Sequence, residues 1–132
     1  MDSTSIDLAG STITAVQVDG DQVRVLFAPA YLVKSMTGSV ERTRWWQNGA
    51  LVFDDAELDD SAPLPALPGE CAGGDVSENV YTYRDMIPVP LDSRGLARCA
   101  LRVGDGVIRV TGASVRLEMD DVPKYIEHVR PS

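Results

Sequence analysis

Apolar and polar residues alternate along residues 12–27 in two runs that meet at Gly20-Asp21. A glycine in a two-residue connection supplies the positive φ that tight hairpin turns require. One register then places the large apolar side chains on a single face, by pairing Val18 with Val23, Val16 with Val25, and Thr14 with Phe27. The pattern predicts a β-hairpin that is buried on one face and solvated on the other.

A similar pattern recurs over residues 97–112, at an offset that takes Ala15 to Ala100 and Val25 to Val110. At this offset the second hairpin is expected to pair Val103 with Ile108 and Leu101 with Val110 across Asp105-Gly106. The recurrence predicts two similar hairpins related by an approximate internal symmetry.

Between the hairpins the periodicity is weaker. Residues 35–48 keep neither a period of 2 nor one of 3.6, which predicts a long loop. A strand over residues 50–58 is expected to follow the Asn48-Gly49 turn. Prolines and glycines crowd residues 61–74, a composition that predicts an irregular, mobile segment.

Two further strands are predicted after this segment, and then a helical ending. Residues 80–84 alternate as a strand does, and prolines restrict residues 86–91 to a sheet edge or an extended segment. The last residues, 121–132, carry apolar side chains at spacings of three and four, namely Val122, Tyr125, Ile126 and Val129. This spacing predicts a short C-terminal helical turn.

The predicted fold is all-β: a small antiparallel sandwich or partly open barrel with two similar hairpins and a short C-terminal helical turn. Residues 1–10 are small and polar and are expected to form a flexible lead-in, followed by one β domain over residues 11–132. A chain of 132 residues of which 44% are hydrophobic is long and apolar enough for one core without disulfides or metal.

The formal net charge of −8 argues against nucleic acid or an anionic membrane surface as the main partner. The first residues include Asp2 and lack the basic and apolar regions of a secretory signal, so a cytoplasmic location is expected. Cys71 and Cys99 are then expected to be unbridged thiols.

The chain also resembles a group of short bacterial all-β proteins of unassigned function. The resemblance lies in turn and strand residues: residues 18–21, Pro29-Ala30-Tyr31, residues 87–91, Arg116-Leu117-Glu118 and Tyr125-Ile126-Glu127. It implies a bacterial origin and a compact β domain, and it implies no activity.

Catalytic and metal-binding arrangements have weak support in the sequence. His128 is the single histidine, so a Cys-His pair would have to bring Cys71 or Cys99 to the C-terminal tail. Hard oxygen ligands and one imidazole gather near the same tail, but their spacing fits no known metal loop: Glu118, Asp120, Asp121, Glu127 and His128. We therefore expect no catalytic residue of this kind, no metal and no cofactor.

The most distinctive patch contains both tryptophans within an otherwise acidic chain, at Arg42, Arg44, Trp45 and Trp46. Trp and Arg are enriched where proteins contact partners, although a tryptophan can equally fill a core. Since adjacent residues of an extended chain point to opposite sides, one ring is expected in the core and the other at the surface. A second set was expected to extend the same surface: Tyr81, Tyr83 and Arg84.

These features favour a non-enzymatic binding module for a protein partner or small ligand, with a homodimer as one possibility. A hydrolase or isomerase with acid/base carboxylates in a barrel mouth is the first alternative. A structural subunit of a homo-oligomer is the second.

Overall fold

The computed structural model describes residues 3–36, 38 and 40–129, and these form eleven antiparallel strands. The strands are β1 (Ser3–Asp7), β2 (Thr12–Asp19), β3 (Gln22–Ser35), β4 (Arg42–Asp54), β5 (Glu57–Leu58), β6 (Gly69–Glu78), β7 (Tyr81–Arg84), β8 (Met86–Val89), β9 (Asp92–Val103), β10 (Gly106–Met119) and β11 (Lys124–Val129). The all-β prediction is confirmed.

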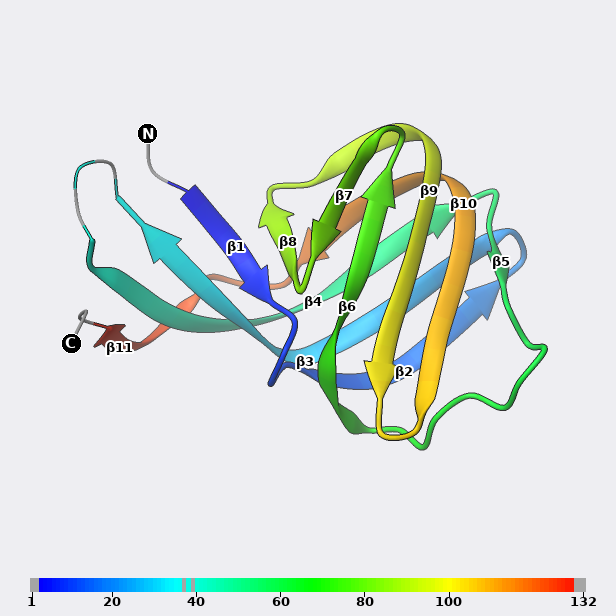
Figure 1. Cartoon of the computed structure of the whole chain (residues 1–132), viewed down its shortest axis with the longest axis horizontal. Coiled ribbons are helices and arrows are strands. Elements are labelled where there is room, and N and C mark those ends of the chain that lie inside the picture. The colour runs from blue at the N-terminus through cyan, green and yellow to red at the C-terminus, as the bar shows by residue number, and fades with distance from the viewer. Residues whose placement is uncertain (1–2, 37, 39, 130–132) are drawn as a thin grey trace.

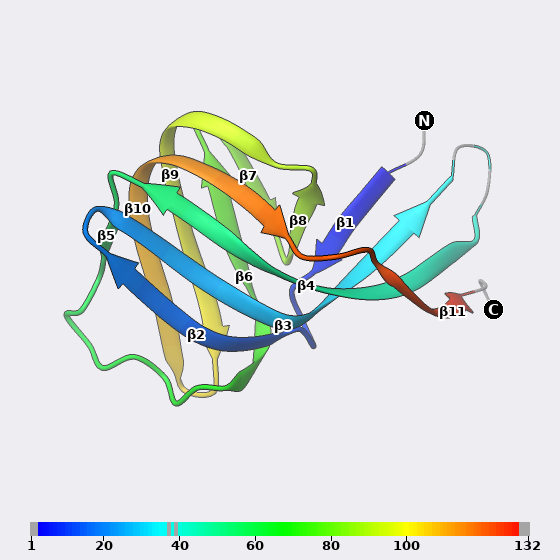
Figure 2. The same ribbon diagram turned by 180° about the vertical axis from the view of Figure 1, so that it is seen from behind.

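Six strands close a barrel in the order β3-β4-β10-β9-β6-β2 and back to β3. β3 and β4 are long, and beyond the barrel they continue side by side, with β1 added next to β3 and β11 next to β4. We call this extension the arm; it consists of β1, residues 31–35, residues 42–46 and β11. Figures 1 and 2 show the arm projecting from one side of the barrel, away from the segment that joins β5 to β6.

Alternate residues of the barrel strands form the interior, as the period of a strand requires. On β4, for example, Leu51 and Phe53 belong to the core, whereas the intervening Val52 does not. The largest completely buried side chains include Phe27, Phe53, Ile6, Leu8, Ile13, Leu32, Leu51, Ile87, Leu101 and Ile108.

The first hairpin has the predicted connection, Gly20-Asp21, and the predicted pairs Val18–Val23 and Val16–Val25. A bulge between Ile13 and Ala15 shifts the register beyond these pairs, so Phe27 lies opposite Ile13 and not opposite Thr14.

The predicted register of the second hairpin is wrong by two residues. Its connection is Gly104-Asp105, which places Val103 opposite Gly106 and Leu101 opposite Ile108. Gly20 and Gly104 have nearly equal φ values, 59° and 57°, so each turn begins with its glycine in the left-handed region. The offset that superimposes the two turns thus differs by one residue from the offset that aligned the apolar residues. A single symmetry therefore does not relate both the turns and the apolar faces.

The loop predicted over residues 35–48 is also wrong for most of its length. β4 begins at Arg42 and continues through Asn48 and Gly49 without a turn, because it is paired with β3 on one side and with β11 and then β10 on the other. The tryptophan patch is therefore part of a strand.

As far as residue 129 the predicted C-terminal helical turn is not formed, since residues 124–129 are strand β11, hydrogen-bonded to residues 42–46 of β4; residues 130–132 lie outside the described residues. Within the expected lead-in, Ser3–Asp7 form β1, which pairs with β3 and β8; residues 1 and 2 lie outside the described residues. β7 agrees with the strand predicted over residues 80–84, and β8 is an edge strand, as its prolines predicted.

Candidate functional site

Trp45 and Trp46 point to opposite faces of the arm, as adjacent strand residues must. Trp45 lies across from Leu32, packs against the core and meets the Tyr125 ring edge-on, with the ring centroids 5.3 Å apart. Its indole N–H donates to the Thr43 hydroxyl at 2.8 Å. Both tryptophans are only half-buried, so the expected division into one core ring and one exposed ring is less complete than adjacency alone suggested.

Trp46 lines an open groove on the other face of the arm, which has a volume of about 450 Å³. Tyr31, directly across from Trp46 on β3, forms the neighbouring part of the groove. The remaining lining residues are Ala28, Pro29, Asn48 and Ile126. We call this the aromatic groove.

Two irregularities in the strands shape the aromatic groove. The register of β3 against β4 shifts between Phe27 and Ala30, which places Pro29 at one end of the groove. The register of β11 against β4 shifts between Tyr125 and Glu127, so Ile126 is the extra residue and its side chain lines the groove. Bulges commonly redirect a side chain in this way.

Cations lie over the aromatic rings of the arm. The Lys124 amine is 4.8 Å from the centroid of the Trp46 ring, and the Arg44 guanidinium is 5.5 Å from that of Tyr31. On the opposite face, the Lys34 amine is 4.2 Å from the Trp45 centroid. Contacts of this kind orient a cation over the ring without neutralising its charge.

Four cations of the arm form no salt bridge with a carboxylate among the described residues. They are Lys34, Arg42, Arg44 and Lys124. On the barrel, Arg24, Arg84, Arg102 and Arg116 form salt bridges, whereas Arg94, Arg98 and Arg109 form none with the described residues. The Arg44 Nε is moreover buried and has no hydrogen-bond acceptor within the described part of the chain. These arm cations thus form no salt bridge within the described residues, although Asp7 and Glu127 line one cavity together with Arg42 and Arg44.

Three polar groups at the aromatic groove also have no acceptor among the residues described: the Tyr31 hydroxyl, the Trp46 indole N–H and the Asn48 side-chain amide. The Asn48 side chain is exposed, whereas its backbone carbonyl accepts from the Asp120 N–H at 2.9 Å. The groove therefore combines apolar walls with several free donors, a typical composition of a ligand site.

The buried amide of Gln47 fixes the position of β11 beside the groove. Its Nε2 donates to the backbone carbonyls of Asp120 and Asp121, each at 2.9 Å. These bonds hold the β10–β11 connection against β4, so that Lys124 and Ile126 reach the groove.

The predicted site residues are thus not all brought together. Arg44 and Trp46 share the face of the groove with Arg42, whereas Trp45 lies on the opposite face. Tyr81, Tyr83 and Arg84 are on β7, which pairs with β6 on a different part of the barrel, and Arg84 is bound to Asp75 there. Sequence reasoning missed Tyr31, Lys124 and Ile126, since only the pairing of β4 with β3 and β11 places them beside Trp46.

A second candidate is a polar cavity of about 380 Å³ on the barrel, lined by Asp54, Asp55, Asp92, Arg94, Ala113, Ser114 and Arg116. Asp54 is bound there by Arg116, by the Gln22 amide at 3.0 Å and by the Ser114 hydroxyl at 3.2 Å. These bonds hold the pKa of Asp54 below its usual value, with the Gln22 amide as the largest contributor and Arg116 next. The carboxyl is therefore stabilised as an anion, which does not suit a general acid.

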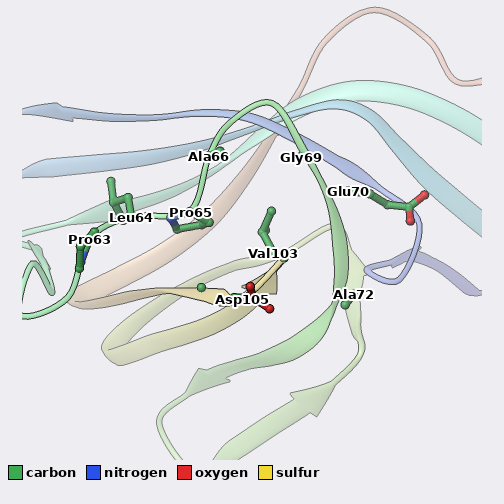
Figure 3. A pocket seen from close by; sticks show the side chains of 11 residues that line it. Pro63, Leu64, Pro65, Ala66, Gly69, Glu70, Ala72, Val103 and Asp105 are labelled. Carbon is green, nitrogen blue, oxygen red and sulfur yellow. The ribbon is translucent and has the colours of Figure 1, made fainter.

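A hollow of about 810 Å³ lies under the segment that joins β5 to β6. Figure 3 shows this segment passing from Pro63 through Ala66 to Gly69 above Val103, with the Glu70 side chain directed outward. The hollow reaches the β9–β10 turn at Asp105 and is lined mainly by prolines and small residues.

The two other arrangements considered from the sequence were a metal cluster and a Cys-His pair. Within the described ranges no group of three or more His, Cys, Asp and Glu side chains is placed to hold a metal ion. Cys71 and Cys99 are free and buried, and the His128 Nε2 lies 3.0 Å from the Glu41 carboxylate. Over the same residues no helix is long and apolar enough to cross a membrane.

No family model, no curated protein and no solved structure matches this chain.

Proposed function

We propose that this protein is a non-enzymatic interaction module, and that its aromatic groove binds an extended, proline-containing segment of a protein partner with acidic residues beside it. The observation that carries the proposal is the combination of Trp46 and Tyr31, side by side in an open groove, with Lys124 and Arg44 over their rings, two cations that form no salt bridge with any residue the structure describes. Rigid aromatic side chains and arginine are the residues that contribute most to protein interfaces.

The shape and chemistry of the groove favour a polyproline II segment. Such a segment has no internal hydrogen bonds, so its carbonyl groups are free to accept from the Asn48 amide and the Trp46 indole N–H. Proline rings are compact, rigid and apolar and pack well against aromatic walls, which is how aromatic-lined grooves recognise them. Lys124 and Arg44 then favour acidic residues next to the prolines.

The carboxylates of the polar cavity support this proposal over acid/base catalysis. A carboxyl group that acts as general acid near neutral pH needs a raised pKa. The carboxyl pKa shifts resolved among the described residues, at Asp54, Asp59 and Glu118, are all downward.

The test uses a fluorescein-labelled peptide, Asp-Asp-Ser-Pro-Pro-Leu-Pro-Pro-Leu-Pro, and a control peptide with lysines in place of the aspartates. Fluorescence anisotropy should show that the acidic peptide binds the protein and that Trp46→Ala weakens binding at least about tenfold. Arg98→Ala is the matched control, because Arg98 is an exposed barrel cation outside the groove. Equal binding by Trp46→Ala and the unchanged protein, or no binding of either peptide, contradicts the proposal.

A further inference from the structure

We propose that the partner segment is residues 59–68 of a second copy of this chain, so that copies associate head to tail, with the segment of one in the aromatic groove of the next. This inference rests on the proposed function and names its partner. The segment lies between β5 and β6 and combines two aspartates with three prolines, in the order Asp59-Asp60-Ser61-Ala62-Pro63-Leu64-Pro65-Ala66-Leu67-Pro68.

The segment has the exposure that a bound peptide needs. Residues 59–64 are all exposed, and Leu64 keeps 40% of its surface accessible. Leu67, in contrast, packs against the core and anchors the end of the segment. Because the segment passes over a hollow and is not packed on the barrel along its whole length, its outer side is available to another molecule (Figure 3).

Charge favours the same pairing. Asp59 and Asp60 come directly before the prolines, and Glu57 comes shortly before them. At the groove Lys124 lies over Trp46 and forms no salt bridge within the described residues. Arg44 lies over Tyr31 and also forms none, but it lines the neighbouring cavity beside Asp7 and Glu127, so Lys124 is the main cation that the groove offers. In a protein of net charge −8, contacts between copies are otherwise opposed by like charge, so a joint between an acidic segment and a basic groove is the favourable one.

The arrangement of the chain makes the contact intermolecular. The segment lies on the side of the barrel away from the arm, as both views of the ribbon show (Figures 1 and 2). A molecule therefore does not place its own residues 59–68 in its own groove. The two surfaces are different, so the contact is heterologous and can repeat from copy to copy.

Within the joint we place the prolines against Trp46 and Tyr31, and Leu64 against Ile126. Carbonyl groups of the segment accept from the Asn48 amide and the Trp46 indole N–H, while Asp59 and Asp60 face Lys124 and Arg44. On the groove side, the Trp46 indole N–H, the Asn48 amide and Lys124 have no acceptor among the described residues, whereas on the segment side the Asp59 carboxylate already accepts from the Ser61 N–H at 2.9 Å and would have to share that bond.

The experiment exploits the two different surfaces. Sedimentation velocity of the unchanged protein over a range of concentrations should show a mass that rises with concentration and falls with added salt. Trp46→Ala removes the groove and Leu64→Asp damages the segment, so each variant alone should remain a monomer. An equimolar mixture should form a dimer and nothing larger, because only one intact groove–segment pair is available. Val80→Asp, at an exposed position of the barrel, is the control and should associate like the unchanged protein.

Binding of the labelled acidic proline peptide separates this inference from the proposed function. Circular dichroism of each variant first establishes that it is folded. If the unchanged protein stays a monomer, or if the mixture of Trp46→Ala and Leu64→Asp forms no dimer, self-association through these surfaces is wrong. If at the same time the acidic proline peptide still binds in a Trp46-dependent manner, the groove retains its proposed function and only the identity of the partner is overturned.

Discussion

Val52 is completely buried although it lies on the outer wall of the barrel, where its strand neighbour at the same register is Arg116. Arg24 flanks it on the other side. Both arginines are bound to Glu118, each at 2.9 Å, and Arg116 is also bound to Asp54. Since paired residues of antiparallel strands point to the same side, this ion-pair network lies over Val52 and shields it from water.

This network should make stability dependent on pH in the acid range. The Arg116 and Arg24 guanidinium groups hold the pKa of Glu118 below its usual value, and the Gln22 amide and Arg116 do the same for Asp54. The folded protein therefore binds fewer protons than the unfolded chain near pH 4. The resulting stabilisation is present above the ordinary carboxyl pKa values and is lost as pH falls through the lowered ones.

Urea unfolding midpoints measured between pH 7 and pH 2.5 should fall most steeply below about pH 4.5. Glu118→Gln should reduce that slope. Glu57→Gln is the control and should leave the slope nearly unchanged, because it removes an exposed carboxylate that forms no ion pair in the described part of the chain. At pH 7, Arg116→Met should cost on the order of 1 kcal/mol, since the groups are partly exposed and solvent weakens their attraction. Identical slopes for both glutamine variants would contradict the expected role of the network.

The two tryptophans should respond differently to truncation. Trp45 packs against the core and Tyr125, so Trp45→Ala is expected to lower the free energy of unfolding by about 3 kcal/mol. Trp46 faces the open groove, and Trp46→Ala is expected to cost only about 1 kcal/mol. Thermal unfolding of the two single variants checks this, and equal, large losses would mean that both rings serve mainly to stabilise the fold.

Gly74 should not tolerate a side chain. Its φ of +155° is rarely adopted by other residues, and an added Cβ would clash with the Ala100 carbonyl oxygen and lie 2.9 Å from the Leu101 Cα, both on β9. Because backbone atoms in a paired strand have little room to move, Gly74→Ala is expected to cost about 3 kcal/mol or more. Gly104→Ala is the control: it meets no atom within 4 Å, and its φ of +57° should cost only about 1 kcal/mol. A similar loss of stability in both variants would show that φ, and not the close approach to β9, is responsible.

The cysteines should be unreactive in the folded protein. Burial raises the pKa of Cys71, and it raises that of Cys99 to about 12, so neither forms a thiolate readily at neutral pH. A colorimetric thiol reagent without reductant should therefore detect almost no thiol in the native protein and two thiols in denaturant. Rapid reaction under native conditions would show that the surrounding strands open easily, and no thiol in denaturant would indicate a disulfide.

Much of the local structure was predictable from the sequence. Strict alternation and the glycine turn were enough for the β2–β3 hairpin and its pairing near the turn, because side-chain period and turn length together determine register over a few residues. Prolines identified β8 as an edge strand because proline lacks the N–H that a central strand would donate. The Arg42–Trp46 patch was recognised as a candidate contact surface from its composition alone.

The arm and its groove depended on tertiary structure. The spacing of Tyr125, Ile126 and Val129 fits a helix as well as an irregular strand, and the hydrogen bonds of β11 to β4 decide between them. Trp46, Tyr31 and Lys124 meet because three distant segments are paired at one register, and the bulge at Ile126 turns that side chain into the groove. The sequence by itself determined which residues prefer strands and turns, since those preferences are local. Only the folded barrel decided which strands are neighbours, because that choice is set by burying the whole core and satisfying every backbone hydrogen bond at once.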